Sequence, residues 1–185
     1  MIINALRIWY CARISPVITH SIRMKEDVYA ILKREATSKS VSLNNLVSQI
    51  LEKYAEFDRF VEKFQFIFFH KNLVLRGLQA FSEKEARGVG NPVGAAFAKD
   101  AFLMMGLPFN KESMKYFIET IVAGYKNFCT CEKHSVGNKE LFYLRHDLGP
   151  KWSAFLSGYV SGAFKNILGE EIVAETHGDG VSFTM

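Results

Sequence analysis

The sequence predicts an α+β protein in which an N-terminal arm of one strand and two helices precedes a domain of helices and antiparallel strands. Apolar residues alternate with period two over residues 17–24 and then recur at helical spacing. None of the 16 phenylalanines precedes Phe57, so the two parts should bury different cores. Beyond the arm, helical patterns give way twice to short paired strands, which is typical of an antiparallel sheet.

The bulk composition allows for both parts. A chain of 185 residues can hold a small arm and a domain with its own core. Hydrophobic residues at 49% and charged residues at 23% are values of a folded chain. We expect a flexible extension over 1–16, the arm over 17–60, and an α+β domain that dimerises or senses a ligand over 61–185.

The net charge of +4 is unevenly distributed. Residues 1–55 hold eight Lys/Arg and four Asp/Glu, whereas the remaining residues hold equal numbers of both signs. All the excess positive charge therefore lies in the first third of the chain. This placement favours a nucleic-acid contact there and argues against a basic surface elsewhere.

The arm begins with a short alternating segment after Pro16. Because successive side chains of a strand point to opposite faces, the alternation predicts an inward and an outward set. The inward set is Ile18, His20, Ile22 and Met24, and the outward set is Thr19, Ser21 and Arg23. A helix follows from Lys25 to about Ser38. Ser42 is placed to cap a second helix, whose apolar stripe extends as far as Phe64.

This pattern resembles the ribbon-helix-helix family of DNA-binding proteins. The matching residues are Ser21-Ile22-Arg23-Met24-Lys25-Glu26-Asp27-Val28 and Ser42-Leu43-Asn44-Asn45-Leu46-Val47. The resemblance implies that two chains pair their strands into a ribbon that enters the DNA major groove. It departs from the family at Lys25, where proline is frequent, and at His20, where an apolar residue is common.

The same resemblance implies two sets of DNA contacts. Thr19, Ser21 and Arg23 would read base edges, since arginine can bind guanine O6 and N7 and hydroxyls can bind either kind of edge. Ser42, Leu43 and Asn44 would hold a phosphate through the free N–H groups that begin the second helix.

The C-terminal region reads as several helices, a hairpin, a long helix and a final hairpin. Expected helices cover 73–81, 82–105 (interrupted near 88–92), 110–125 and 150–168, and expected strands cover 128–134, 139–146, 171–177 and 181–185. The run Phe66–Phe69 fits either a strand or a helix. In the long helix, Ser157-Gly158 and Ser161-Gly162 set small residues four apart, which would let another backbone approach closely.

Residues from about 141 to 185 resemble the ligand-sensing fold of the four-vinyl-reductase or haem-NO-binding-like superfamily. The residues that carry this resemblance are Phe155-Leu156-Ser157-Gly158-Tyr159-Val160-Ser161-Gly162 and Gly178-Asp179-Gly180-Val181-Ser182-Phe183. The resemblance implies a sensor domain. The cysteines that often flank the last turn in that superfamily are absent here, so no haem or metal role carries over.

Cys129, Cys131 and His134 form a C-x-C-x-x-H cluster that could contribute to a metal site, with His146 or His177 as a further ligand. Zinc sites more often use C-x-x-C turns, so ordinary strand cysteines are the favoured interpretation and we expect no metal and no cofactor. A redox-sensing role would require both thiols to be exposed. The chain shows no nucleotide loop, nucleophile elbow or H-E-x-x-H signature, so we do not expect an enzyme.

These features together favour a homodimeric, sequence-specific transcriptional regulator with a C-terminal sensor or oligomerisation domain. Its expected partners are double-stranded DNA, a second copy (with a tetramer as a further assembly) and an apolar small molecule. No apolar run reaches the ~20 residues of a membrane span, so we expect a cytoplasmic protein without a membrane partner. Two alternatives remain: an antitoxin that represses its own operon and binds a toxin, and a ligand or metal module that binds no DNA.

Overall fold

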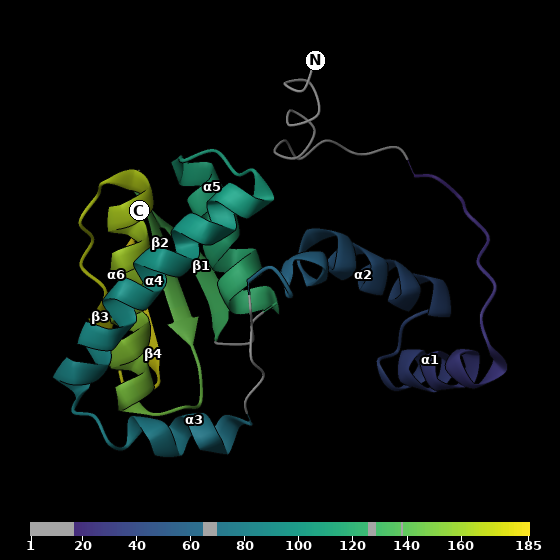
Figure 1. Ribbon diagram of the computed structural model, residues 1–185, viewed down its shortest axis with the longest axis horizontal. Coiled ribbons are helices and arrows are strands. Elements are labelled where there is room, and N and C mark those ends of the chain that lie inside the picture. Colours follow the sequence, from purple (N-terminus) through teal and green to yellow (C-terminus); the bar gives the residue numbers. More distant parts are fainter. Residues whose placement is uncertain (1–16, 65–69, 126–128, 138) are drawn as a thin grey trace. The chain divides into compact units, whose positions relative to one another are not determined.

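The computed structural model describes residues 17–64, 70–125, 129–137 and 139–185 (Figure 1). The extension expected over 1–16 and the run Phe66–Phe69 lie outside the described residues. The chain divides into two compact units, residues 1–61 and residues 62–185. The mixed α+β class is confirmed, because helices are combined with a four-stranded antiparallel sheet.

The described part of the first unit contains two helices and a single helical turn. Helix α1 covers Glu26–Ser38, helix α2 covers Leu43–Glu56, and the 3-10 turn η2 covers Asp58–Phe60. The two helices expected here are therefore present. The second one does not continue to Phe64, because Phe57 leaves the helical region with φ −137° and ψ −56°.

The strand expected over 17–24 is not formed in the single chain. Residues 17–25 carry neither strand nor helix, and Val17 and Ile18 are 95% and 85% exposed. A strand obtains its ladder hydrogen bonds from a neighbouring strand. The described part of the arm contains no second strand, so any ladder would have to come from another chain.

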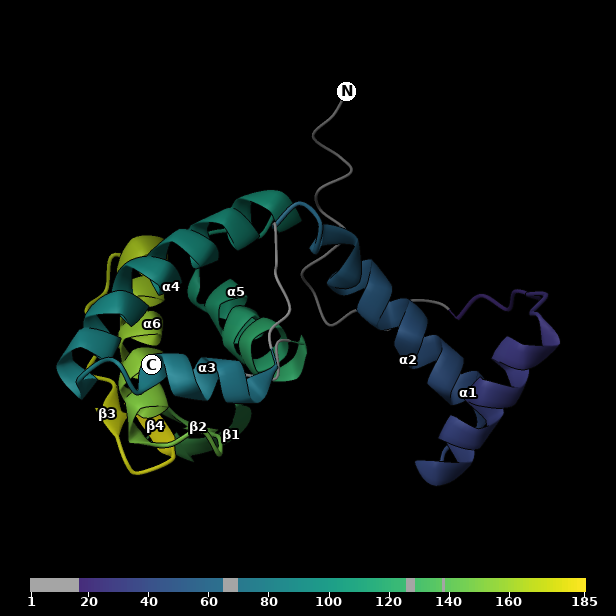
Figure 2. The same cartoon turned by 60° about the horizontal axis from the view of Figure 1, so that its bottom comes forward.

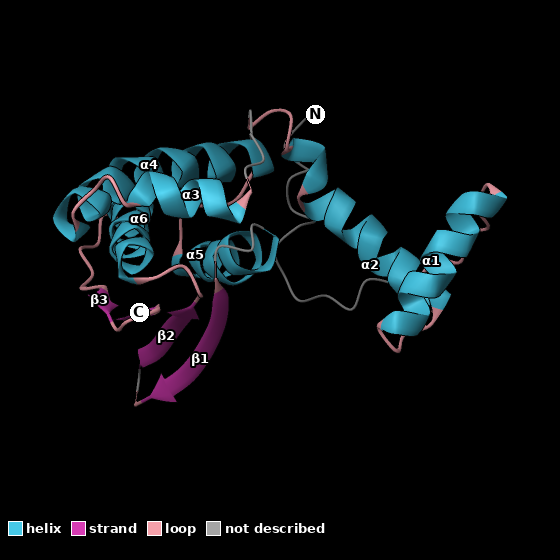
Figure 3. Cartoon of the chain, turned by 90° about the horizontal axis from the view of Figure 1, so that it is seen from below, coloured by secondary structure: helices cyan, strands magenta, loops and turns pink. Residues whose placement is uncertain are grey.

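The second unit contains helices on one side of an antiparallel sheet (Figure 3). Its helices are α3 (Lys71–Leu78), α4 (Glu83–Met105), α5 (Lys111–Tyr116), the π-helix η3 (Phe117–Tyr125) and α6 (Pro150–Leu168). Its strands are β1 (Thr130–Val136), β2 (Lys139–Arg145), β3 (Glu175–Thr176) and β4 (Gly180–Thr184), in the order β1-β2-β4-β3. None of the helices in the described ranges has the length and apolar character that crossing a membrane requires.

Several elements of the second unit differ from those expected. Helix α4 runs without interruption through Pro92, and Ser82 starts it as a capping box with Glu85. The segment expected as one helix over 110–125 changes to π-helix at Phe117. Strand β3 holds only two of the seven residues expected, because its ladder with β4 spans only Glu175↔Ser182 and Thr176↔Val181.

Helices α4 and α6 lie side by side (Figures 1 and 2) and pack backbone against backbone. A Cβ placed on Gly90 or Gly94 of α4 would lie 2.0 Å from a carbonyl oxygen of α6. Gly158 and Gly162 of α6 are in the same position against carbonyl oxygens of α4, at 2.1 and 2.0 Å. The small residues four apart in α6 therefore face a matching pair in α4. This close approach explains why α4 carries Gly90 and Gly94 in its interior.

One part of the core of the second unit lies between α6 and the sheet, and α4, α5 and η3 contribute the rest. Phe142 of β2 and Phe183 of β4 are register partners, and their rings stack with centroids 5.2 Å apart. Phe164 of α6 meets Phe183 edge-on at 5.5 Å. All three side chains are buried, so the long helix is held on the sheet by aromatic packing.

Candidate functional site

The residues expected to read bases lie in the exposed segment before α1. Thr19, Ser21 and Arg23 are all exposed, and no strand ladder fixes their directions in the single chain. The segment enters α1 at Lys25, whose backbone is extended with φ −68° and ψ 149°. The structure leaves these three side chains accessible but does not assemble them into a surface.

The residues expected to hold a phosphate lie together at the start of α2. Ser42 Oγ accepts a hydrogen bond from Asn45 N at 3.1 Å and so caps the helix. The N–H groups of Leu43 and Asn44 occupy the first two helical positions, where no acceptor exists within the helix. The first turn of α2 has no acidic residue, whereas that of α1 has Glu26 and Asp27. Of the two N-termini, only that of α2 suits an anion.

The two helices of the arm leave most of their apolar side chains in solvent. Only Ala36 of α1 and Leu46 of α2 are buried. The apolar side chains that remain 41–59% exposed are Val28, Tyr29, Ile31, Ile50, Leu51 and Tyr54. So many exposed apolar side chains on a short segment are typical of a surface that another chain covers.

The candidate metal residues Cys129, Cys131 and His134 are not brought together. Cys131 pairs with Leu144 and His134 with Leu141 in the ladder of β1 with β2, so these two side chains lie on opposite faces of the sheet. Within the described ranges, no group of three His, Cys, Asp or Glu side chains could hold a metal ion. Burial raises the pKa of Cys129 to about 12 and that of Cys131 to about 11, so neither thiol is a ready thiolate.

His146 and Ser153 form a hydrogen bond that resembles a catalytic pair, but the proton is donated in the direction opposite to that of a catalytic base. Ser153 Oγ donates to Gly178 O at 2.5 Å and lies 2.9 Å from His146 Nε2. The backbone N–H of Leu148 donates to His146 Nδ1 at 3.2 Å. The imidazole must therefore carry its proton on Nε2 and donate it to the serine. Because the hydroxyl already serves a carbonyl, the pair fastens α6 to the β3–β4 turn and is not a nucleophile with its base.

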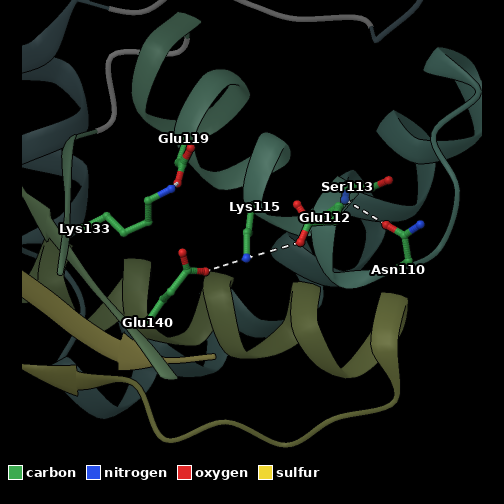
Figure 4. Close-up of polar contacts among 7 residues, drawn as sticks. All are labelled: Asn110, Glu112, Ser113, Lys115, Glu119, Lys133 and Glu140. Atoms are coloured by element: carbon green, nitrogen blue, oxygen red, sulfur yellow. Dashed lines mark hydrogen bonds and ion pairs between the residues drawn. The ribbon is translucent and has the colours of Figure 1, made fainter. Parts of the chain in front are cut away.

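A charged cluster joins α5 and η3 to strands β1 and β2 (Figure 4). Lys115 Nζ lies 2.5 Å from Glu140 Oε2 and 3.3 Å from Glu112 Oε1, and Lys133 Nζ lies 2.7 Å from Glu119 Oε1. The hydrogen bonds to Glu140 and to Glu119 raise the pKa of Lys115 and of Lys133, respectively. These lysines are held as paired cations, so the cluster is a structural connection.

The charged cluster was missed by sequence reasoning. Lys115 and Glu140 lie on different elements, and no local pattern links a helix to a strand in this way. Lys133 and Glu119 also border a groove of about 450 Å³ beside Cys131, where the two side chains form an ion pair with each other.

Comparisons of the chain with protein-family models, with curated proteins and with solved structures find no match.

Proposed function

We propose that the protein is a homodimeric, sequence-specific DNA-binding regulator. The first unit pairs with that of a second copy and places a two-stranded ribbon in the major groove, and the second unit acts as a sensor or oligomerisation domain. The observation that carries the proposal is the arm itself: an extended exposed segment, followed by two short helices whose apolar side chains remain in solvent.

The arm has a physical reason to dimerise. Helices α1 and α2 bury two side chains between them, which is too little apolar surface for a stable unit of this length. A second copy would cover the exposed stripe and would also supply the antiparallel neighbour that residues 17–24 lack. The pairing turns Ile18 and Ile22 toward the partner and leaves Thr19, Ser21 and Arg23 on the outer face.

The outer face of such a ribbon suits DNA. Arg23 can form a bidentate contact with guanine, and Thr19 and Ser21 offer hydroxyls to neighbouring base edges. The start of α2 supplies the N–H groups of Leu43 and Asn44 for a backbone phosphate, next to the exposed Ser42 cap. The excess positive charge of residues 1–55 adds the electrostatic attraction that all DNA binding uses.

The proposal is tested by selecting DNA from a random pool with the full-length chain, with sedimentation used to measure its mass. We expect a dimer that selects a defined sequence with an affinity that falls as salt rises. Arg23→Ala should weaken specific binding by about 1–3 kcal/mol and broaden the selected sequence. The matched control is Arg76→Ala, which removes the same charge from an exposed position in the second unit and should leave the selected sequence unchanged.

Two results would refute the regulator. The first is a purified chain that selects no sequence and whose residual DNA affinity is the same with Arg23→Ala. The second is a stable monomer at concentrations where DNA is bound specifically, because one chain cannot form the ribbon.

A further inference from the structure

An apolar pocket lies in the second unit between α3, α4 and α6. Its volume is about 300 Å³, at the lower end of the range for small-molecule sites. Helix α3 and its end form one wall, α4 the second and α6 the third. The lining residues are Val74, Gly77, Leu78, Phe81, Ala86, Val89, Trp152 and Phe155.

The lining determines what the pocket can accept. All eight lining residues are apolar or glycine, so a charged ligand would lose its hydration without gaining a partner. The Trp152 and Phe155 rings stack with centroids 4.9 Å apart and present aromatic surface from α6. Aromatic rings pack well against other rings in offset or edge-on geometry. The pocket therefore suits a neutral, flat, aromatic molecule.

Helix α3 covers the pocket but is weakly held. None of its residues is buried. Lys71, at its first position, forms an ion pair with Asp147, and Lys151 Nζ donates to Gln79 O just past its end at 2.8 Å. Both contacts are solvent-exposed, and such contacts add little stability. An apolar molecule in the pocket would supply the burial that α3 lacks.

Gly77 keeps the pocket open. It lies on the same face of α3 as Val74 and Leu78, at the spacing that brings side chains to one side of a helix. Its φ is not positive, and a Cβ added to it would meet no atom within 4 Å. Neither backbone conformation nor close packing requires glycine here, although glycine weakens a helix relative to alanine. The visible effect of this glycine is the space that it leaves.

We propose that this pocket binds a neutral aromatic small molecule of about two fused rings, and that the bound molecule holds α3 against α4 and α6. Helix α3 is the first described helix after the DNA-binding arm in the chain. The bound molecule is therefore the signal of the sensor domain, an extension that rests on the proposed function. Binding of the molecule itself does not depend on it.

The test uses the full-length protein and the fluorescent probe N-phenyl-1-naphthylamine, with naphthalene as competitor. We expect saturable binding of one probe per chain, displacement by naphthalene, and slower hydrogen exchange in α3 when naphthalene is bound. Gly77→Leu places a side chain in the pocket and should weaken probe binding at least about tenfold, because the space is lost. The matched control is Gly88→Leu, an exposed glycine of α4 that also has no atom within 4 Å of its added Cβ and should bind as the wild type does.

Three results would overturn the proposal: no saturable binding by the wild type, unchanged binding by Gly77→Leu, or displacement by decanol at lower concentration than by naphthalene. If Gly77→Leu fails to fold, Gly77→Ala gives the same test at smaller volume and should weaken binding by a smaller factor. No DNA enters these measurements. A chain that binds the probe but selects no DNA sequence would refute the regulator and leave the pocket intact.

Discussion

The contact between α4 and α6 gives a prediction whose sign depends on the tertiary structure. In Gly94→Ala the new Cβ would lie 2.0 Å from Tyr159 O, whereas real Cβ contacts are essentially never under 3.0 Å. The helices must therefore separate by about 1 Å at this point, since the opposing atom is backbone and cannot rotate away. Overpacking typically costs about 1–3 kcal/mol, and we expect the upper end because the shift also disturbs the contacts of Gly158 and Gly162.

The net change follows after the helix preference is included. Alanine is favoured over glycine in a helix interior by about 1 kcal/mol. Gly94→Ala should therefore lower the free energy of unfolding of the second unit by about 2 kcal/mol. Gly88→Ala, six residues earlier in α4, meets no atom within 4 Å and should instead raise it by up to about 1 kcal/mol.

The assay is urea unfolding followed by tryptophan fluorescence. A Trp9→Phe background makes Trp152, which is buried in α6, the only tryptophan in the chain. The midpoint should fall for Gly94→Ala and rise for Gly88→Ala at unchanged slope. If both variants are stabilised to the same extent, α4 and α6 do not approach each other as closely as described.

Two further predictions concern titratable groups of the second unit. Burial lowers the pKa of His146 below its usual 6.5, so the unfolded chain binds the proton more tightly than the folded chain. The free energy of unfolding should therefore fall as the pH drops through about 6.5. His146→Gln should flatten that part of the plot of unfolding free energy against pH. Parallel pH dependences for the two proteins would contradict this. Cys129 and Cys131, with pKa values of about 12 and 11, should react slowly with iodoacetamide in the native chain at about pH 8 and fully in urea. Peptide mass spectrometry measures the labelling of each cysteine. Rapid labelling of the native chain would show that the two thiols are not shielded from solvent.

Local signals predicted much of the fold. Ser42 as a cap and Pro150 with Gly169 as the bounds of a long helix are features of a few neighbouring residues, and the structure has them as expected. Prediction was wrong where a distant contact overrides the local pattern. Gly88, Gly90 and Pro92 suggested a break in α4, but Gly90 is required by the close approach of α6, and the helix continues.

Some candidate site residues could likewise be found from local sequence signals, whereas others could not. Thr19, Ser21, Arg23 and the start of α2 were found from alternation, capping and the family resemblance, and their role in DNA binding stays a prediction. The separation of Cys131 from His134 depends on strand parity, which the spacing already contained. The pocket under α3 could not be predicted, because its walls come from three helices far apart in the chain.

The sequence by itself determined the order of the helices and strands in the second unit, the excess positive charge of residues 1–55 and the apolar stripes of α1 and α2. These depend on residue type and periodicity, which act over one or two turns. Only the tertiary structure decided that α4 is the partner of the small residues in α6, that β2 pairs with β4, and that α3 leaves a pocket beneath it. Such pairings depend on which distant surfaces fit at atomic distance, and that fit is a property of the whole packed unit.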